Sequence, residues 1–115
     1  QPSPIYFLWS GCNLERDTLR YPTVISGFKH RRLERFFLTG SKSGIRPEHV
    51  KRIRLVLGRL QASRSAADMN LPGLYLHELK GKRRGFWSVR VSGNWRITFR
   101  FEGLDATDIT YEDYH

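Results

Sequence analysis

The chain has 115 residues, of which 20 are Lys or Arg and 11 are Asp or Glu, so its net charge is +9. This length is that of a single domain with one core, and a hydrophobic content of 39% excludes wholesale disorder. No apolar run approaches the roughly 20 residues that cross a bilayer, so we expect no membrane partner. The positive charge favours a polyanion as the partner, and nucleic acid above all.

The first 23 residues differ from the rest of the chain in composition and charge. They hold the single cysteine, Cys12, which excludes an internal disulfide and suits a reducing cytosol, so we expect a cytoplasmic protein. Their apolar run, Ile5–Trp9, is too short for a secretory signal and lacks its basic flank. Their positive and negative charges cancel, so the whole net charge of +9 lies in residues 24–115. We therefore divide the chain into an N-terminal extension, 1–23, and a domain, 24–115.

The first half of this domain predicts one strand and two helices. In chain order they are Val24–Phe28 (strand), His30–Leu38 (helix) and Pro47 to about Ala62 (helix). Gly40 is placed to end the first helix, and Pro47 suits the first turn of the second. Basic residues lie mostly outside the buried stripe of the second helix, among them Lys51, Arg52 and Arg54.

The second half of the domain predicts a sheet. Its strands are Leu74–His77, Phe86–Val91, Trp95–Phe101 and Ala106–Tyr111. A basic loop, Lys80–Gly85, precedes the second of these strands, and Ser92–Asn94 is a good hairpin turn. Alternation predicts a core face made of Trp87, Val89, Val91, Trp95, Ile97, Phe99 and Phe101. It predicts an opposite, arginine-bearing face made of Ser88, Arg90, Arg96, Thr98 and Arg100.

The sequence lacks the motifs of several common types of site. It has no Cys/His cluster with zinc spacing, no glycine-rich phosphate loop and no glycine-flanked nucleophilic serine, so we expect neither a metal nor a cofactor. The histidines at positions 30, 49, 77 and 115 have no metal-motif spacing. We expect His30 and His49 at the surface, since they sit on predicted helices beside lysine or glutamate.

Several motifs of the domain resemble those of one toxin family. They are Ser26–His30, Leu76–Gly81, Trp87–Val89, Asn94–Phe99 and Tyr111–His115. In this order they resemble the HigB toxins of the RelE/ParE superfamily. The resemblance implies an α+β, RelE-like fold, with two N-terminal helices packed on one face of a twisted, mostly antiparallel sheet of about four to five strands. It also implies a functional start at Val24; the alternative is an N-terminal strand that packs on the domain.

By the same resemblance, the activity is ribosome-dependent cleavage of mRNA in the decoding site of the small subunit, which inhibits translation. The partner is a HigA-like antitoxin. The catalytic positions of the family fall on Lys80, Asp113, Tyr114 and His115. We expect RNA contacts from His77, Lys82, Arg83, Arg84 and Arg96, and ribosome contacts from Lys51, Arg52 and Arg54.

The chemistry of these residue types agrees with cleavage that needs no metal. RNA is cut when its own 2′-hydroxyl attacks the adjacent phosphate, which requires a proton acceptor, a proton donor and cations. His115 titrates near neutral pH, so it can serve either proton role. Lys80 and Arg96 can neutralise phosphate. Tyr114 can stack on a base or donate to phosphate, and Asp113 can orient His115 or read a base edge.

Each of these residues also has a purely structural interpretation. A terminal Tyr-His is usually a frayed chain end, and Lys80 alone is typical of a solvated loop. Arg96 could form an ion pair with Glu102 or Asp113, and His77 could be hydrogen-bonded structure. For the whole protein, the alternatives are a ParE-like toxin, which inhibits gyrase and needs no acid–base group, and a non-catalytic RNA-binding module.

The end of the last strand poses a geometric problem. If this strand runs straight, Asp113 and His115 share the core face of Tyr111, whereas Arg96 faces the other way. We therefore expect either a bulge or bend near Glu112 or a tail that projects past the edge of the sheet.

Overall fold

The computed structural model describes residues 24–113. In chain order its elements are β1 (Val24–Ile25), α2 (Arg31–Thr39), η1 (Pro47–His49), α3 (Val50–Gln61), η2 (Ala66–Met69), β2 (His77–Glu78), η3 (Gly81–Arg83), β3 (Trp87–Ser92), β4 (Trp95–Glu102) and β5 (Asp105–Asp113). The N-terminal extension, 1–23, and the terminal Tyr114 and His115 lie outside the described residues, so what was predicted for them stays a prediction.

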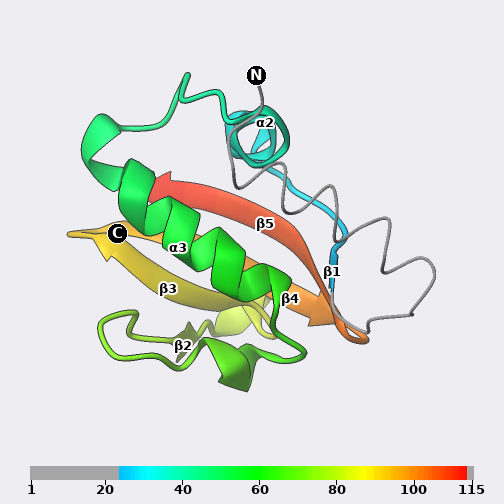
Figure 1. Cartoon of the computed structure of the whole chain (residues 1–115). Helices are drawn as coiled ribbons and strands as arrows, with labels where there is room; N and C mark the ends of the chain where they lie inside the picture. The colour runs from blue at the N-terminus through cyan, green and yellow to red at the C-terminus, as the bar shows by residue number, and fades with distance from the viewer. Residues whose placement is uncertain (1–23, 114–115) are drawn as a thin grey trace.

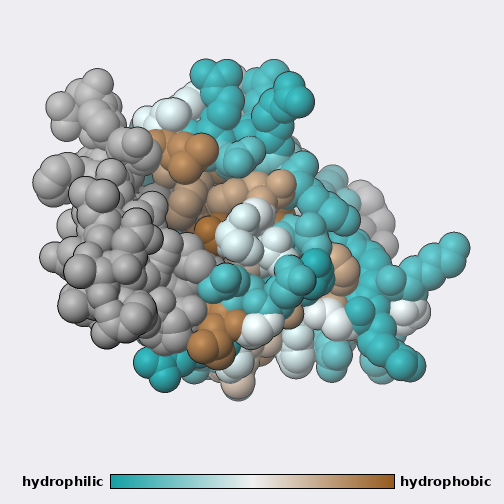
Figure 2. Space-filling view, turned by 90° about the vertical axis from the view of Figure 1, so that its right-hand side faces the viewer, coloured by the Kyte–Doolittle hydropathy of each residue, from teal (hydrophilic) through white to brown (hydrophobic). Residues whose placement is uncertain are grey.

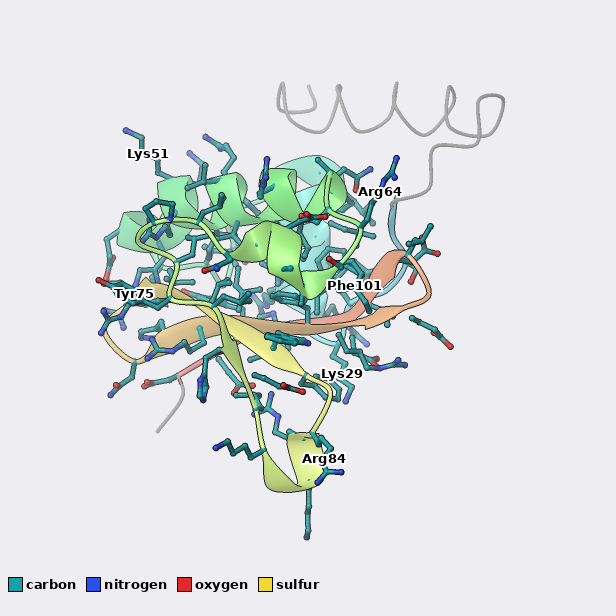
Figure 3. The ribbon with its side chains drawn as sticks, turned by 90° about the horizontal axis from the view of Figure 1, so that it is seen from below. Lys29, Lys51, Arg64, Tyr75, Arg84 and Phe101 are labelled. Atoms are coloured by element: carbon teal, nitrogen blue, oxygen red, sulfur yellow. The ribbon has the colours of Figure 1, made fainter. Side chains whose placement is uncertain are left out.

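One sheet holds all the strands of the described chain, in the order β1-β5-β4-β3-β2. The strands from β2 to β5 pair antiparallel with their neighbours, and β1 adds a short parallel edge to β5. Both α-helices lie on one side of this sheet, and α3 runs across it (Figure 1, Figure 3). The expected α+β architecture, two helices on one face of a mostly antiparallel sheet, is confirmed.

The helices begin and end where nearby groups can satisfy the free backbone atoms. His30 caps α2, because its Nδ1 accepts the N–H of Leu33 at 3.1 Å. Gly40 ends α2 in the left-handed conformation, with φ 81°, and its N–H donates to the Phe36 carbonyl. Pro47 opens η1, which leads directly into α3. Both predicted helices are confirmed, with ends close to those expected.

The core lies between the helices and the face of the sheet that alternation predicted. Residues with 0% exposure come from both layers: Leu33, Ile53, Val56, Leu57, Leu60, Met69, Val89, Ile97, Phe99 and Ile109. Trp87, Trp95 and Phe101 pack against this cluster and stay partly exposed. The predicted core face of β3 and β4 is therefore confirmed. We call the opposite face, which points away from α2 and α3, the open face.

The core reaches the surface at the end of the sheet that holds the β4–β5 turn. Figure 2 views the molecule from this end, and hydrophobic surface gathers there between hydrophilic flanks. Trp87, Phe101 and Leu76 line a hollow with Arg64, and Leu104 in the turn is 48% exposed. This hollow lies at the opposite end of the sheet from the point where β5 ends.

Two predicted strands differ from those observed. β2 is His77–Glu78 rather than Leu74–His77, because the segment before it turns and only the Leu74 carbonyl meets β3, where it accepts the Arg90 N–H at 2.7 Å. β1 ends at Ile25, although Phe28 makes an isolated bridge to Ile109.

β5 contains a bulge that was not predicted. Asp108 and Ile109 together oppose Phe99 of β4, and Asp108 takes a φ of 54°. The extra residue shifts the alternation by one, so that Ala106, Ile109 and Tyr111 all face the core. The bulge therefore decides which residues at the end of β5 lie on the open face.

Candidate functional site

The end of β5 is held in regular register against the start of β4. Asp113 pairs with Trp95 and Glu112 with Arg96, and the pairing continues without a shift as far as Thr110. Alternation therefore puts Glu112 on the open face beside Arg96, and Asp113 on the same side as Trp95. Asp113 itself is exposed.

This register corrects one expectation about the tail. The predicted bulge near Glu112 is wrong, because the only register shift between β4 and β5 in the described residues lies earlier, at Asp108. The other expectation, a tail that leaves the edge of the sheet, falls on Tyr114 and His115 and so lies outside the described residues.

The basic loop extends from the open face, on the opposite side of the sheet from the helices (Figure 3). Lys80, Lys82 and Arg84 are all exposed there. Lys80 and Arg84 also line a hollow with Glu78 and Leu79. The loop thus presents cationic side chains to solvent beside a small hollow, which is an arrangement that suits an anionic ligand.

The remaining basic side chain of this loop, Arg83, points back to the sheet. Its guanidinium donates to both carboxylate oxygens of Glu112, at 2.9 and 3.2 Å, and to Thr98 Oγ1 at 3.2 Å. The same guanidinium lies 5.9 Å from the centre of the Phe86 ring. A two-pronged Arg–carboxylate pair fixes orientation as well as distance, so it ties the loop to the end of β5.

The arginines of the open face are engaged within the protein. Arg96 donates to the Gly93 carbonyl at 2.7 Å and to the Trp95 carbonyl at 3.3 Å. Arg100 pairs with Asp108 at 2.5 Å and with Glu102 at 3.8 Å, so Glu102 is not the partner of Arg96. Arg96 and Arg100 of the predicted arginine-bearing face are therefore bound by other groups of the protein, whereas the basic loop exposes its cations.

His77 lies on β2, opposite Ser88 of β3, and its side chain is exposed. Alternation puts it in one row with Ser88 and Thr98, on the open face that the loop partly covers. The strand pairing therefore puts His77 and Arg96 on the side of the sheet that also carries the basic loop.

A buried polar cluster packs on the helix side of the same strand end, and the sequence did not predict it. His49 is only 3% exposed, so its expected surface position is wrong. Its Nδ1 lies 2.7 Å from the Tyr111 hydroxyl, and its ring also packs against Trp95. His30 is half-buried and meets the edge of the Tyr111 ring. These contacts hold the segment of β5 that leads to Asp113.

Burial shifts the titration of this cluster. Desolvation lowers the pKa of His49; the negative charge of Glu48 opposes that shift, and the positive charge of Arg46 adds to it. Desolvation likewise lowers the pKa of His30. Burial raises the pKa of Tyr111 above its usual value near 10. Near neutral pH both imidazoles and the phenol are therefore uncharged, which suits their contacts with one another.

The three basic residues predicted to meet the ribosome lie near the start of α3. Lys51 is exposed, whereas the Arg52 guanidinium donates to the Gly73 carbonyl at 2.6 Å and that of Arg54 lies 5.8 Å from the centre of the Phe36 ring. All three line a hollow with Leu55, which is 53% exposed. Because α3 begins directly after His49, this basic surface lies at the end of the molecule where β5 ends.

Within residues 24–113, His, Cys, Asp and Glu form no group that could hold a metal ion. The helices of the same part of the chain are too short or too polar to cross a membrane.

Comparisons with known proteins bear on what this site does. Residues 26–115 match the family described as RelE-like toxins of the type II toxin–antitoxin system HigB. The chain belongs to this family. It is also similar to "Endoribonuclease HigB" of Proteus vulgaris, with 41% identity over 92 residues that make up 80% of this chain and 100% of the relative. The resemblance to HigB toxins is thus confirmed, and membership makes the protein a toxin whose partner is an antitoxin.

The low pKa of His49 predicts how stability depends on pH. At pH values well above the reference pKa of about 6.5, His49 is neutral in both the folded and the unfolded protein. As the pH falls below that value, the unfolded ring takes up a proton that the folded ring resists, so the free energy of unfolding decreases until the lowered pKa is passed. Urea unfolding across this range should show a smaller decrease for His49→Gln than for the wild type.

His30 contributes to the same decrease, so part of it remains in His49→Gln. An equal decrease in His49→Gln and the wild type would contradict the assignment to His49.

Proposed function

We propose that this HigB-like toxin is an endoribonuclease that cuts mRNA in the decoding site of the small ribosomal subunit and so inhibits translation. The observation that carries the proposal is its 41% identity, over the whole length of the relative, to a protein named as an endoribonuclease. An exposed basic loop tied to the end of β5 supports it. The antitoxin is HigA-like in this proposal, and the site of action is the cytoplasm.

The proposed cleavage uses the RNA's own 2′-hydroxyl and no metal. The 2′-oxygen bonds to phosphorus while its proton passes to a base, and the 5′-oxygen leaves with a proton from an acid. His115 serves in proton transfer, and Asp113 orients it. Lys80 offsets the charge that develops on the phosphate oxygens, and Tyr114 stacks on a base or donates to phosphate.

The RNA contacts divide between the loop and the open face. Lys82 and Arg84 are the exposed cations of the loop, and they attract the phosphate backbone. His77 and Arg96 lie on the open face, where Arg96 is already anchored to two carbonyls. Arg83 is bound by Glu112, so its first role here is to hold the loop; whether it also touches RNA stays a prediction.

Cleavage on translating ribosomes tests the proposal. We expect a defined message to be cut in the decoding-site codon, with or without a metal chelator. Lys80→Ala should slow cutting by about 10²–10³-fold, because it removes a cation that stabilises the transition state. Protein lacking His115 should not cut. Lys42→Ala, which removes an exposed lysine after α2, is the matched control and should cut like the wild type.

The other outcomes identify the alternatives. Gyrase poisoning without cuts would indicate the ParE-like toxin, and RNA binding without cuts would indicate a non-catalytic module. Cleavage that persists without Lys80 and His115 would reject the assigned residues while leaving the ribonuclease activity in place.

We also propose that Lys51, Arg52 and Arg54 contact ribosomal RNA. Lys51→Glu should weaken ribosome binding and reduce the slope of log K against log salt by roughly one or two units, since a phosphate contact is lost and a repulsion is added. Arg64→Glu makes the same change of charge at the other end of the helical layer (Figure 3) and serves as the control. Equal effects of both variants would show that only the net charge matters.

A further inference from the structure

Tyr75 has a backbone conformation that bulky residues rarely adopt. Its φ is 52°, in the left-handed region, and its side chain is 66% exposed. The neighbouring Leu74 is buried, and its carbonyl accepts the Arg90 N–H at 2.7 Å, so the segment is fixed against β3. Because the ring is exposed, it does not contribute to packing of the core, and core packing does not explain the strained backbone. Such strain is most often kept at functional sites.

Arg90 orients the exposed ring. Its guanidinium lies 4.9 Å from the centre of the Tyr75 ring, within the range of a cation–π contact. Arg90 is half-buried, and its Nε has no hydrogen-bond partner among the described residues, so the ring is a main contact of this side chain. One face of the ring is thus covered by Arg90, and the ring's high exposure leaves surface for a planar ligand.

The position of Tyr75 connects it with the candidate site. Arg90 pairs with Arg96 across the sheet, and Arg96 pairs with Glu112, so these residues form one row on the open face. Neighbouring strands are about 4.8 Å apart, which puts the backbone of Arg90 roughly 10 Å from that of Glu112. Tyr75 lies at the outer end of this row, and Figure 3 shows it far from Phe101 at the other end of the sheet.

We propose that Tyr75 stacks on a nucleobase of the bound mRNA, next to the position of cleavage. The proposal rests on the ribonuclease function proposed above and adds a substrate-binding residue to it. Single-stranded RNA is recognised by stacking of its bases on aromatic side chains, and a ring backed by arginine is suited to this contact. The positive field of the loop brings the phosphate chain to the same side of the sheet.

Two substitutions at this position separate the ring from the backbone. Tyr75→Phe keeps the stacking surface, and Tyr75→Asn removes it while tolerating the left-handed conformation. On ribosomes with a defined message, Tyr75→Phe should cut within about twofold of the wild type. Tyr75→Asn should lose about 5- to 150-fold in cleavage efficiency, the range for one base stack. Leu104→Asn, at an exposed apolar position in the β4–β5 turn, should cut normally.

A second measurement does not depend on cleavage. Adding a short single-stranded RNA should shift the Tyr75 ring resonances upfield in the wild-type protein, and the same RNA should bind Tyr75→Asn more weakly. If the wild type does not cut on ribosomes, the proposed function fails, and this binding measurement alone decides the role of Tyr75.

Three results would overturn the proposal. One is a Tyr75→Asn variant that folds and cuts like the wild type. Another is an equal loss in Tyr75→Phe and Tyr75→Asn, which would assign the effect to the hydroxyl. The third is a Tyr75→Asn variant that binds and cleaves RNA like the wild type but no longer binds the antitoxin. This result would assign the ring to a protein interface.

Discussion

The ion pair between Arg83 and Glu112 joins two segments that lie 29 residues apart in the chain. One is the basic loop, which has only a single turn of 3₁₀ helix to shape it; the other is the end of β5. A loop of this kind has many conformations in isolation, and a two-pronged contact with a strand removes most of them. Thr98 accepts a further hydrogen bond from the same guanidinium, so the loop is also bound to a buried residue of the central strand, β4.

The end of β5 is itself held from both faces. Glu112 is bound by Arg83 on the open face, while Tyr111 meets His49 on the helix side. The bulge at Asp108 makes this possible, because it shifts the alternation so that Tyr111 points inward and Glu112 outward. The last described residues of β5 are therefore held in place on both sides of the sheet, and the proposed cleavage would require such a fixed position of any reacting group near them.

The basic side chains fall into two groups, those bound by other groups of the protein and those exposed to solvent. The arginines of the open face are bound to carbonyls, to carboxylates or to the Tyr75 ring, whereas the cations of the loop are exposed. The protein thus uses part of its basic surplus to organise the surface and leaves part exposed to solvent, where positive charge favours contact with polyanions. Counting arginines on a strand face does not distinguish these uses.

The helices, the hairpin and the core face could be predicted because each depends on local signals. A cap, a stop glycine and a regular apolar period are all visible in a short window, as at Gly40 and Pro47. The burial of His49, the Arg83–Glu112 pair and the φ of Tyr75 could not be predicted in this way. Each depends on a partner brought close by the sheet, and alternation alone does not show the bulge that determines which partners meet. The motifs pointed to the basic loop as a candidate site, but they did not show what holds it in place.

The most direct test of this account is a double-mutant cycle on Arg83 and Glu112, read as mRNA cleavage on ribosomes. If the pair acts by holding the loop against β5, Arg83→Gln and Glu112→Gln each reduce cleavage by a similar factor, on the order of 10²-fold, because a small displacement of reacting groups has that effect. The double variant then loses no more than either single variant. The account is contradicted if Glu112→Gln cuts as well as the wild type or better while Arg83→Gln cuts poorly, since Arg83 would then contact the RNA directly.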